Sequence, residues 1–292
     1  MRTRLVSSVG VVGAGLLPAV AGGPIFAALM VTLGVIGFRE FAEIARRLPT
    51  APILPSTGYP AVAMLGLGSL LAWPLPVVIA IAAAIVVLPL PLLFDRAGNP
   101  GVVEGWALAV AGSFYLGLPI AAAIGLRAHP GKIGAAWLAE AADLASIGWP
   151  ASPRGLAWVL VAIVATWVAD SGAFLVGKTA GRTRLAPRIS PNKTVEGALG
   201  GLLGAVLAAV VLDTVLGLDL GGVAAGLVGA LLAVLGQLGD LAESLLKRQA
   251  GVKDSGAAIP GHGGVLDRID GLLVVLPCAW FLAWLLDGSG AR

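Results

Sequence analysis

The sequence predicts an all-α, polytopic integral membrane protein, and three observations support this fold class. Of the 292 residues, 58% are hydrophobic and only 12% are charged, whereas soluble domains carry about 25% charged residues. The mean hydropathy is +0.95. The apolar residues also form long, nearly uncharged runs, and about 20 consecutive apolar residues suffice to cross a bilayer as a helix.

These apolar runs predict about nine transmembrane helices. The stretch "AGGP" at 21–24 divides the first run, because glycine and proline interrupt helices. If residues 5–38 instead form one tilted helix, the number is eight. Residues 1–23 also resemble a signal peptide, but the next run is membrane-like too, which favours a first transmembrane helix. The candidate spans are 5–21, 24–45, 57–73, 77–94, 102–126, 155–178, 195–216, 220–239 and 265–286.

The charge distribution predicts which face of the membrane carries the chemistry. With nine spans, most lysines and arginines lie in connections that share one face, and the positive-inside rule places that face in the cytoplasm. Connections 178–195 and 240–264 both belong to it, whereas Arg2 and Arg4 fit better with eight spans. The net charge of +3, without a basic stripe interleaved with aromatic residues, does not indicate nucleic-acid binding.

Polar residues gather in the stretch "SLLKRQAGVKDSGAAIPGHGGVLDRID" at 244–270 and just before it. Asp240, Ser244 and Lys247 recur at i, i+4 and i+7, so they share one face of a helix that leaves the membrane. Such a row can serve a metal and a phosphate together. The alternative is an ordinary hydrogen-bonded ladder at a solvated helix end.

The loop that follows is rich in glycine and ends at the next apolar span. Gly263 and Gly264 let the backbone approach a ligand closely, and consecutive N–H groups there can cradle phosphate oxygens. The amino-terminal dipole of the next span, from about Val265, favours an anion at the same place. A flexible turn is the alternative for the loop, and phosphate contact is a hypothesis for His262.

Asp267 and Asp270 are three residues apart and are expected on one face of the first turns of that span. Carboxylates at membrane depth are costly and indicate function by default, although helix capping is an alternative. With Asp240 they supply hard oxygen ligands, which suit Mg²⁺ better than Zn²⁺. Carboxylates beside several basic residues predict a site for a polyphosphate bound with its metal.

A second polar cluster, "GKTAGRTRLAPRISPNKTVEG", occupies residues 177–197. "GAFLVGKT" matches a P-loop by letter, but it ends an apolar helix instead of following a strand, which argues against that motif. Lys193 lies beside a turn and a helix start, with Thr194 near the cap. Asp170 lies inside the preceding span, where an aspartate suggests function. His129 is expected to be solvated, and Cys278 to pack in an apolar run.

Residues 244–270 resemble the signature of a known family, the phosphatidate cytidylyltransferases, also called CDP-diacylglycerol synthases. The resemblance is specific over about 165–272, and the first 150 residues resemble the family only in hydropathy. It also includes the blocks "ADSGAF" (169–174), "ISPNKTVEG" (189–197) and "GDLAES" (239–244). Within 244–270 it is carried by Ser244, Lys247, Arg248, Lys253, Asp254, Pro260, His262, Gly263, Gly264, Asp267, Arg268 and Asp270.

The resemblance implies a membrane enzyme of phospholipid biosynthesis that moves a cytidylyl group from CTP to phosphatidic acid and releases pyrophosphate. It implies Mg²⁺, with a second cation left open, and a homodimer, since the family is dimeric where seen. The expected location is the cell inner membrane, multi-pass, with the active site facing the cytoplasm. We expect N-terminal transmembrane helices in 1–154 and a C-terminal transmembrane catalytic region in 155–292.

Roles for individual residues also follow from the resemblance. Asp240 and Asp267 are expected to hold the metal and to be catalytic. The other expected catalytic residues are Lys253, Asp254 and Asp270. Substrate binding is expected at Lys193, Ser244, Lys247, Arg248, His262, Gly263, Gly264 and Arg268.

Two other functions stay open at this stage. A CTP-dependent polyprenol kinase would share the metal and nucleotide chemistry, but it needs a hydroxyl acceptor and therefore a base. A transporter could use intramembrane carboxylates as relay groups, and it would be expected to show repeated halves. The sequence has no second copy of the glycine-aspartate cluster.

Overall fold

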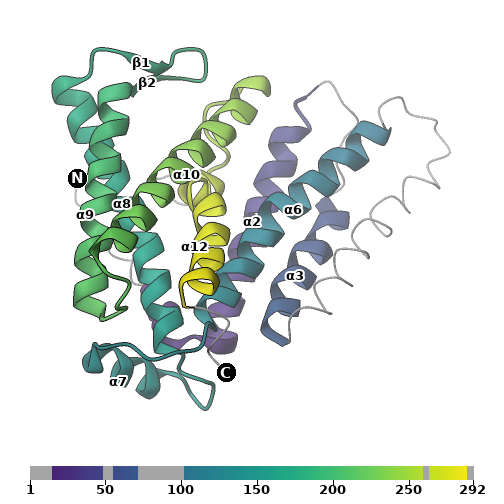
Figure 1. Cartoon of the computed structure of the whole chain (residues 1–292). Helices are drawn as coiled ribbons and strands as arrows, with labels where there is room; N and C mark the ends of the chain where they lie inside the picture. The colour runs from purple at the N-terminus through teal and green to yellow at the C-terminus, as the bar shows by residue number, and fades with distance from the viewer. Residues whose placement is uncertain (1–14, 49–54, 72–101, 259–262, 288–292) are drawn as a thin grey trace, which may run out of the picture. The chain divides into compact units, whose positions relative to one another are not determined.

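The computed structural model describes residues 15–48, 55–71, 102–258 and 263–287, and it is mainly helical, as predicted (Figure 1). Within these residues the strands form one two-stranded antiparallel hairpin. The elements are α2 (Gly23–Ala45), α3 (Pro55–Leu71), α6 (Val102–Arg127), α7 (Ala136–Ala145), α8 (Pro153–Ala180), β1 (Arg184–Ala186), β2 (Ser190–Thr194), α9 (Val195–Leu216), α10 (Gly222–Gln249), α11 (Leu266–Ile269) and α12 (Leu272–Leu286).

Six helical segments of the described residues are long and apolar enough to cross a membrane, which supports the polytopic fold class. A shorter apolar helix, Gly58–Leu70, corresponds to the predicted span 57–73, whereas the predicted span 77–94 lies outside the described residues. The six are Gly23–Ala45, Val103–Arg127, Pro153–Ala180, Val195–Leu216, Gly222–Gln249 and Leu266–Leu286.

The chain breaks where "AGGP" predicts a break. Residues 15–21 are helical, Gly22 is not, and α2 begins at Gly23. Gly22 has φ +67°, a left-handed conformation that glycine adopts without steric cost. This break argues against one continuous helix over 5–38, whereas the number of spans stays a prediction because 5–14 and the candidate span 77–94 lie outside the described residues.

The chain forms two compact units. Unit 1 contains 1–18, 24–125 and 246–269, and unit 2 contains 19–23, 126–245 and 270–292. In unit 1, α2, α3 and α6 pack through glycines. A Cβ at Gly34 of α2 would lie 2.8 Å from Ile120 of α6 and 2.9 Å from Val62 of α3. Small residues allow such close helix approach, as is common in membranes.

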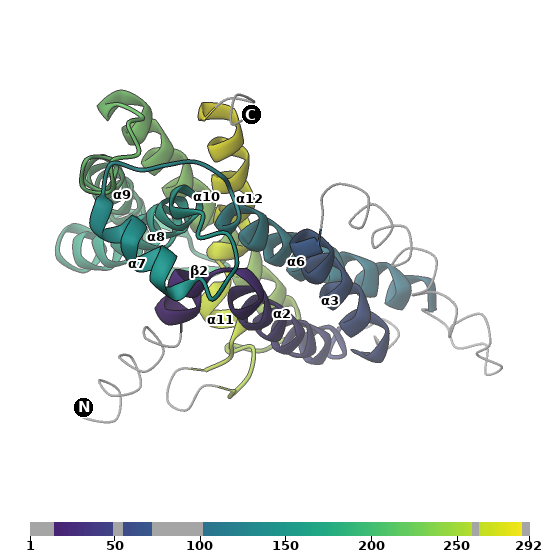
Figure 2. The same cartoon turned by 90° about the horizontal axis from the view of Figure 1, so that it is seen from below.

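In unit 2, α8 and α9 approach so closely that their backbones touch. A Cβ at Gly201 of α9 would lie 2.6 Å from the Ala169 carbonyl oxygen, and one at Gly197 would lie 2.7 Å from that of Ala173. The hairpin β1–β2 joins these helices at one end, and α7 lies at the other (Figure 1). Figure 2 views the molecule from the α7 side. Helix α7 lies in residues 128–154, between the predicted spans 102–126 and 155–178.

The hairpin fixes the start of α9. Arg184 pairs with Thr194 and Ala186 with Ser190, so residues 190–194 form a strand where the sequence suggested a turn. Thr194 caps α9 as expected, because its hydroxyl accepts a hydrogen bond from Gly197 N at 3.1 Å. The Glu196 carboxylate accepts from Arg182 N and Thr183 N, which ties the hairpin to the first turn of α9.

A buried polar cluster closes the opposite end of unit 2. Asp287, at the end of α12, accepts hydrogen bonds from Arg154 Nε at 2.7 Å and Trp158 Nε1 at 3.2 Å, and His129 Nε2 lies 2.8 Å from its Oδ2. His129 is therefore buried, and its expected solvation is wrong. Burial alone raises the pKa of Asp287, but these hydrogen bonds outweigh burial and lower the pKa to about 2.

We predict that Asp287→Asn lowers the free energy of unfolding in detergent by about 1–3 kcal/mol at pH 7, because Arg154 loses a charged acceptor. The folded pKa of Asp287 lies below its ordinary value of 3.8. Its carboxylate therefore stabilises the fold above that value, and this stabilisation is lost as the pH falls towards 2. Melting curves from pH 7 to pH 2 should show the difference between wild type and variant shrinking only at the acid end.

Asp143→Asn is the matched control for this prediction. Asp143 is an exposed carboxylate of α7 in the same unit. Its removal should leave the melting curves nearly unchanged. Equal losses in the two variants would show that the Asp287 cluster is not a stabilising contact.

Candidate active site

In unit 2, an aspartate near the end of α10 is paired with the lysine of strand β2. Lys193 Nζ lies 2.6 Å from Asp240 Oδ2, and Ser244 Oγ donates to Asp240 Oδ1 at 3.3 Å. Asp170 of α8 interacts electrostatically with both Asp240 and Lys193. We call Asp170, Lys193, Asp240 and Ser244 the Asp240 group. It unites residues from both polar clusters that the sequence analysis singled out.

Local structure explains how the Asp240 group forms. Lys193 directly precedes the cap of α9, so the hairpin fixes its backbone. Asp240 and Ser244 are one helical turn apart, as their i, i+4 spacing predicts. Helix α10 continues to Gln249, beyond the predicted span end at 239, and carries this polar row out of the apolar segment.

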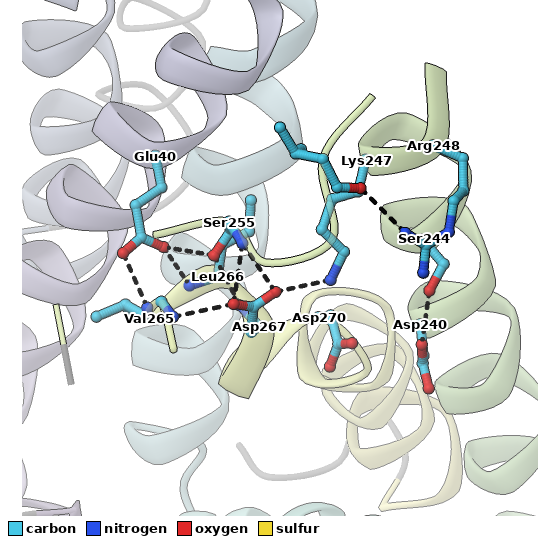
Figure 3. A network of polar contacts seen from close by, with 12 residues as sticks. Glu40, Asp240, Ser244, Lys247, Arg248, Ser255, Val265, Leu266, Asp267 and Asp270 are labelled. Atoms are coloured by element: carbon cyan, nitrogen blue, oxygen red, sulfur yellow. Dashed lines mark hydrogen bonds and ion pairs between the residues drawn. The ribbon is translucent and has the colours of Figure 1, made fainter. Parts of the chain in front are cut away.

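In unit 1, Asp267 lies at the centre of a dense hydrogen-bond network (Figure 3). Lys247 Nζ, from the last turn of α10, donates to Asp267 Oδ1 at 2.7 Å. Ser255 N lies 3.1 Å and 3.0 Å from the two carboxylate oxygens, and Gly264 N donates to Oδ2 at 2.9 Å. We call Glu40, Lys247, Ser255 and Asp267, with the backbone N–H groups of 264–266, the Asp267 network.

Glu40 of α2 is a member of this network that the sequence analysis missed. Its carboxylate accepts from Ser255 Oγ at 2.9 Å, Val265 N at 3.0 Å and Leu266 N at 2.8 Å. In the sequence it lies in "FREFAEIARR", which reads as the polar end of a span. One available signal is its spacing, because Glu40 shares a helix face with the buried residues Gly37, Phe41 and Ile44.

The N–H groups of the glycine loop have partners other than those expected from the sequence. Gly264 N, which was expected to contact phosphate, donates to the Asp267 carboxylate. The N–H groups of Val265 and Leu266 donate to Glu40. A Cβ at Gly264 would lie 2.0 Å from Ser255 Oγ, so packing alone requires glycine there. Gly263 has φ +85°, which also favours glycine. His262 lies outside the described residues.

Asp267 and Asp270 were expected on the first turns of one helix, but the helical segment 266–286 is interrupted by a turn between them. Helix α11 ends at Ile269 and α12 begins at Leu272, so Asp270 lies in the turn between them. Its Oδ1 accepts a hydrogen bond from the adjacent Gly271 N at 2.7 Å. The side chain of Asp270 therefore helps to fix this turn.

The remaining predicted site residues are exposed, and they lie in the last turn of α10, in the segment after it and in α11. Arg248 is exposed, and its Nη1 donates to the Val252 carbonyl oxygen at 3.1 Å. Lys253, Asp254 and Arg268 are also exposed. The solvent-facing cations Arg248, Lys253 and Arg268 are accessible to an anionic ligand.

The comparisons with known proteins identify the family. The model of the cytidylyltransferase family matches residues 2–286. This chain belongs to the cytidylyltransferase family. The match covers the apolar N-terminal part as well as the motif-rich region, although the sequence resemblance was specific only over about 165–272.

Several relatives within the cytidylyltransferase family carry the name phosphatidate cytidylyltransferase. The protein from Bacillus subtilis is 49% identical over 128 residues, which cover 44% of this chain and 48% of the relative. That from Pseudomonas aeruginosa is 47% identical over 137 residues, covering 47% and 49%. That from Synechocystis sp. is 34% identical over 145 residues, covering 47% and 49%. The chain spans about half the length of the curated relatives it matches.

The described side chains of this cytidylyltransferase-family protein offer oxygen ligands that suit Mg²⁺, but they do not form a complete coordination shell. Within the described residues, no three or more His, Cys, Asp or Glu side chains cluster as a metal-binding group. Mg²⁺ usually takes one or two carboxylates together with substrate phosphates and water, and an all-protein cage is unusual for it. Carboxylates such as Asp240 and Asp267 supply the hard oxygens required. In the structure Asp240 is paired with Lys193, and Asp267 with Lys247.

We predict that Gly264→Ala lowers the melting temperature of the protein even without nucleotide, because the new methyl group collides with Ser255 and Glu40. An overpacked site of this kind typically costs about 1–3 kcal/mol. Thermal unfolding in detergent measures the effect. Ala257→Val adds bulk at an exposed position of the same loop and should leave the melting temperature unchanged. An unaffected melting temperature in Gly264→Ala would mean that the loop is not held as described.

Proposed function

We propose that this chain transfers a cytidylyl group from CTP to phosphatidic acid, giving CDP-diacylglycerol and pyrophosphate. The observation that carries the proposal is the pairing of both candidate metal-binding carboxylates with lysines, Asp240 with Lys193 and Asp267 with Lys247. These residues belong to the motif shared with phosphatidate cytidylyltransferases. The names of the relatives support the same activity.

The reaction balances as a single displacement at phosphorus. A phosphate oxygen of phosphatidate forms a bond to the α-phosphorus of CTP, the bond from that phosphorus to the bridging oxygen breaks, and pyrophosphate leaves with the electron pair. Positioning and charge neutralisation supply most of the catalysis in such transfers. Because the attacking phosphate is already an anion, a strong general base is unnecessary.

The basic side chains neutralise the two anionic substrates in this proposal. Lys193 and Lys247 have carboxylate partners that a phosphate can replace as acceptor, since both are hard oxygen anions. The exposed guanidinium groups offer bidentate contacts to phosphate oxygens, which an ammonium cannot match. The proposed contact residues are Lys193, Lys247, Arg248, Lys253 and Arg268.

Asp240 and Asp267 are the residues proposed to hold Mg²⁺. When bound, the ion neutralises the charge of the triphosphate and polarises its phosphoryl oxygens. Ser244 keeps Asp240 oriented through its hydroxyl, and Ser255 with Gly264 does the same for Asp267 through backbone N–H groups. A second cation beside the first remains a proposal.

The membrane explains how two unlike substrates are supplied. We propose that phosphatidate enters sideways from the bilayer, while CTP arrives from the cytoplasm. A multi-pass protein of the inner membrane with its site at the cytoplasmic surface meets both requirements. A homodimer is part of the same proposal, by resemblance to the family.

The decisive assay places the label on one phosphate of CTP at a time. Purified protein with phosphatidate, Mg²⁺ and α-labelled CTP should give a labelled lipid, whereas γ-labelled CTP should label only pyrophosphate. Asp240→Asn and Asp267→Asn should each lower the rate at least a hundredfold, and the exposed control Asp219→Asn should not. Lipid labelled from the γ-phosphate, with polyprenol as acceptor, would instead identify a kinase. No labelled lipid at all would overturn the proposal and leave a transporter open.

Orientation is tested by labelling single cysteines in a Cys278→Ala background. Arg188→Cys in the hairpin and Ala257→Cys in the glycine loop lie at exposed positions. Both should react with an impermeant thiol reagent only after the cytoplasmic face is opened. Lys132→Cys, in the connection between α6 and α8, should react in intact cells. Labelling of either of the first two from outside would reverse the topology.

A further inference from the structure

We infer that Glu40 is a positioning residue for the nucleotide site, and that it holds the glycine loop and, through the loop, Asp267. The effect of Glu40 on catalysis rests on the proposed function, whereas its anchoring of the loop does not depend on which reaction the protein catalyses. Glu40 comes from α2, far in sequence from the motif that resembles the family.

The Glu40 carboxylate is almost fully buried, at 4% exposure. A buried carboxylate is costly unless donors satisfy its oxygens. Here Oε1 accepts from Val265 N, and Oε2 accepts from both Leu266 N and Ser255 Oγ. Hydrogen bonds to a charged acceptor are about twice as strong as neutral ones. Glu40 therefore fixes the loop at both of its sides, at Ser255 and at 265–266.

Ser255 transmits this anchoring to Asp267. Its hydroxyl donates to Glu40 and accepts from Asp267 N at 3.3 Å. Its own N–H lies within hydrogen-bond distance of both Asp267 carboxylate oxygens. Glu40 thereby fixes the backbone and, through Ser255, the side chain of Asp267. Lys247 completes the arrangement on Oδ1.

Two glycines let the loop reach Glu40. A Cβ at Gly256 would lie 2.7 Å from Glu40 Oε1, and one at Gly264 would lie 2.5 Å from Oε2. Any side chain at either position would push the loop away from the carboxylate. Because the N–H groups of 264–266 bind the chain's own carboxylates, this described end of the loop is held in place before nucleotide arrives.

Amide hydrogen exchange of the protein without nucleotide tests the anchoring directly. In Glu40→Gln the amide group brings N–H donors towards donors of the loop, so Val265 N and Leu266 N should exchange at least tenfold faster. Glu43→Gln is the matched control, since Glu43 lies on the same helix, half exposed, and pairs with Arg39 at the surface. In Glu43→Gln the amides of Val265 and Leu266 should exchange at the wild-type rate. Equal exchange in wild type and Glu40→Gln would overturn the inference.

Kinetics then separate positioning from general support of the fold. Glu40→Gln should lower kcat/KM for CTP at least tenfold and change KM for phosphatidate less than twofold, and Glu40→Asp should recover part of the loss. Equal effects on both substrates would overturn the positioning role. If Glu40→Gln does not fold, Ser255→Ala removes the bridge while keeping both carboxylates, and it should give the same exchange and kinetic pattern. If the proposed function is wrong but the anchoring is right, no lipid product will form, while amide exchange will still be faster in Glu40→Gln than in wild type.

Discussion

A charged group at the edge of a bilayer must find its counter-charge or its hydrogen-bond donors inside the protein, and the functional parts of this structure depend on that constraint. Lys247 and Asp267 form a buried ion pair, and removing one partner of such a pair costs about 3–5 kcal/mol, because the other charge is left uncompensated. Asp287 is paired with Arg154, and the partly exposed Asp240 is paired with Lys193. Glu40 is satisfied by backbone and hydroxyl donors.

The same constraint shapes the backbone around these groups. Between α10 and α11, Ser255 and residues 264–265 contact Glu40 and Asp267, and Gly256 and Gly264 lie where the chain approaches a carboxylate. The hairpin β1–β2 serves Lys193 in a similar way, because it delivers the lysine beside the capped start of α9. The charges of the candidate site are therefore ordered before a substrate binds. Such preorganisation is what charge stabilisation of a phosphoryl transfer requires.

The sequence predicts those features that depend on local composition. Apolar runs predicted each of the long helices, "AGGP" predicted the break at Gly22, and the Asp240–Ser244 spacing predicted their contact. The family followed from residues 244–270 and their neighbouring blocks. The metal-binding roles of Asp240 and Asp267 and the cytoplasmic orientation stay predictions.

The features that the sequence did not predict depend on contacts distant in the chain. Glu40 meets Ser255 across more than 200 residues, and His129 meets Asp287 across more than 150. The helical spacing of Glu40 indicates a buried face but not its partner, and no periodicity in the sequence indicates the pairing of His129 with Asp287. The turn at Asp270 was missed because the apolar pattern of 265–286 continues through it. The hairpin was missed because its short strands, rich in polar residues, look like a loop.

A double-mutant cycle on Lys247 and Asp267 tests the central claim most directly, with stability measured by reversible unfolding in detergent without substrate. The account predicts that Lys247→Met and Asp267→Asn each cost about 3 kcal/mol or more, and that the double variant costs clearly less than their sum. The exposed pair Arg39 and Glu43, treated in the same way, should show a coupling of less than about 1 kcal/mol. Additive effects at Lys247 and Asp267, within about 0.5 kcal/mol, would contradict the account.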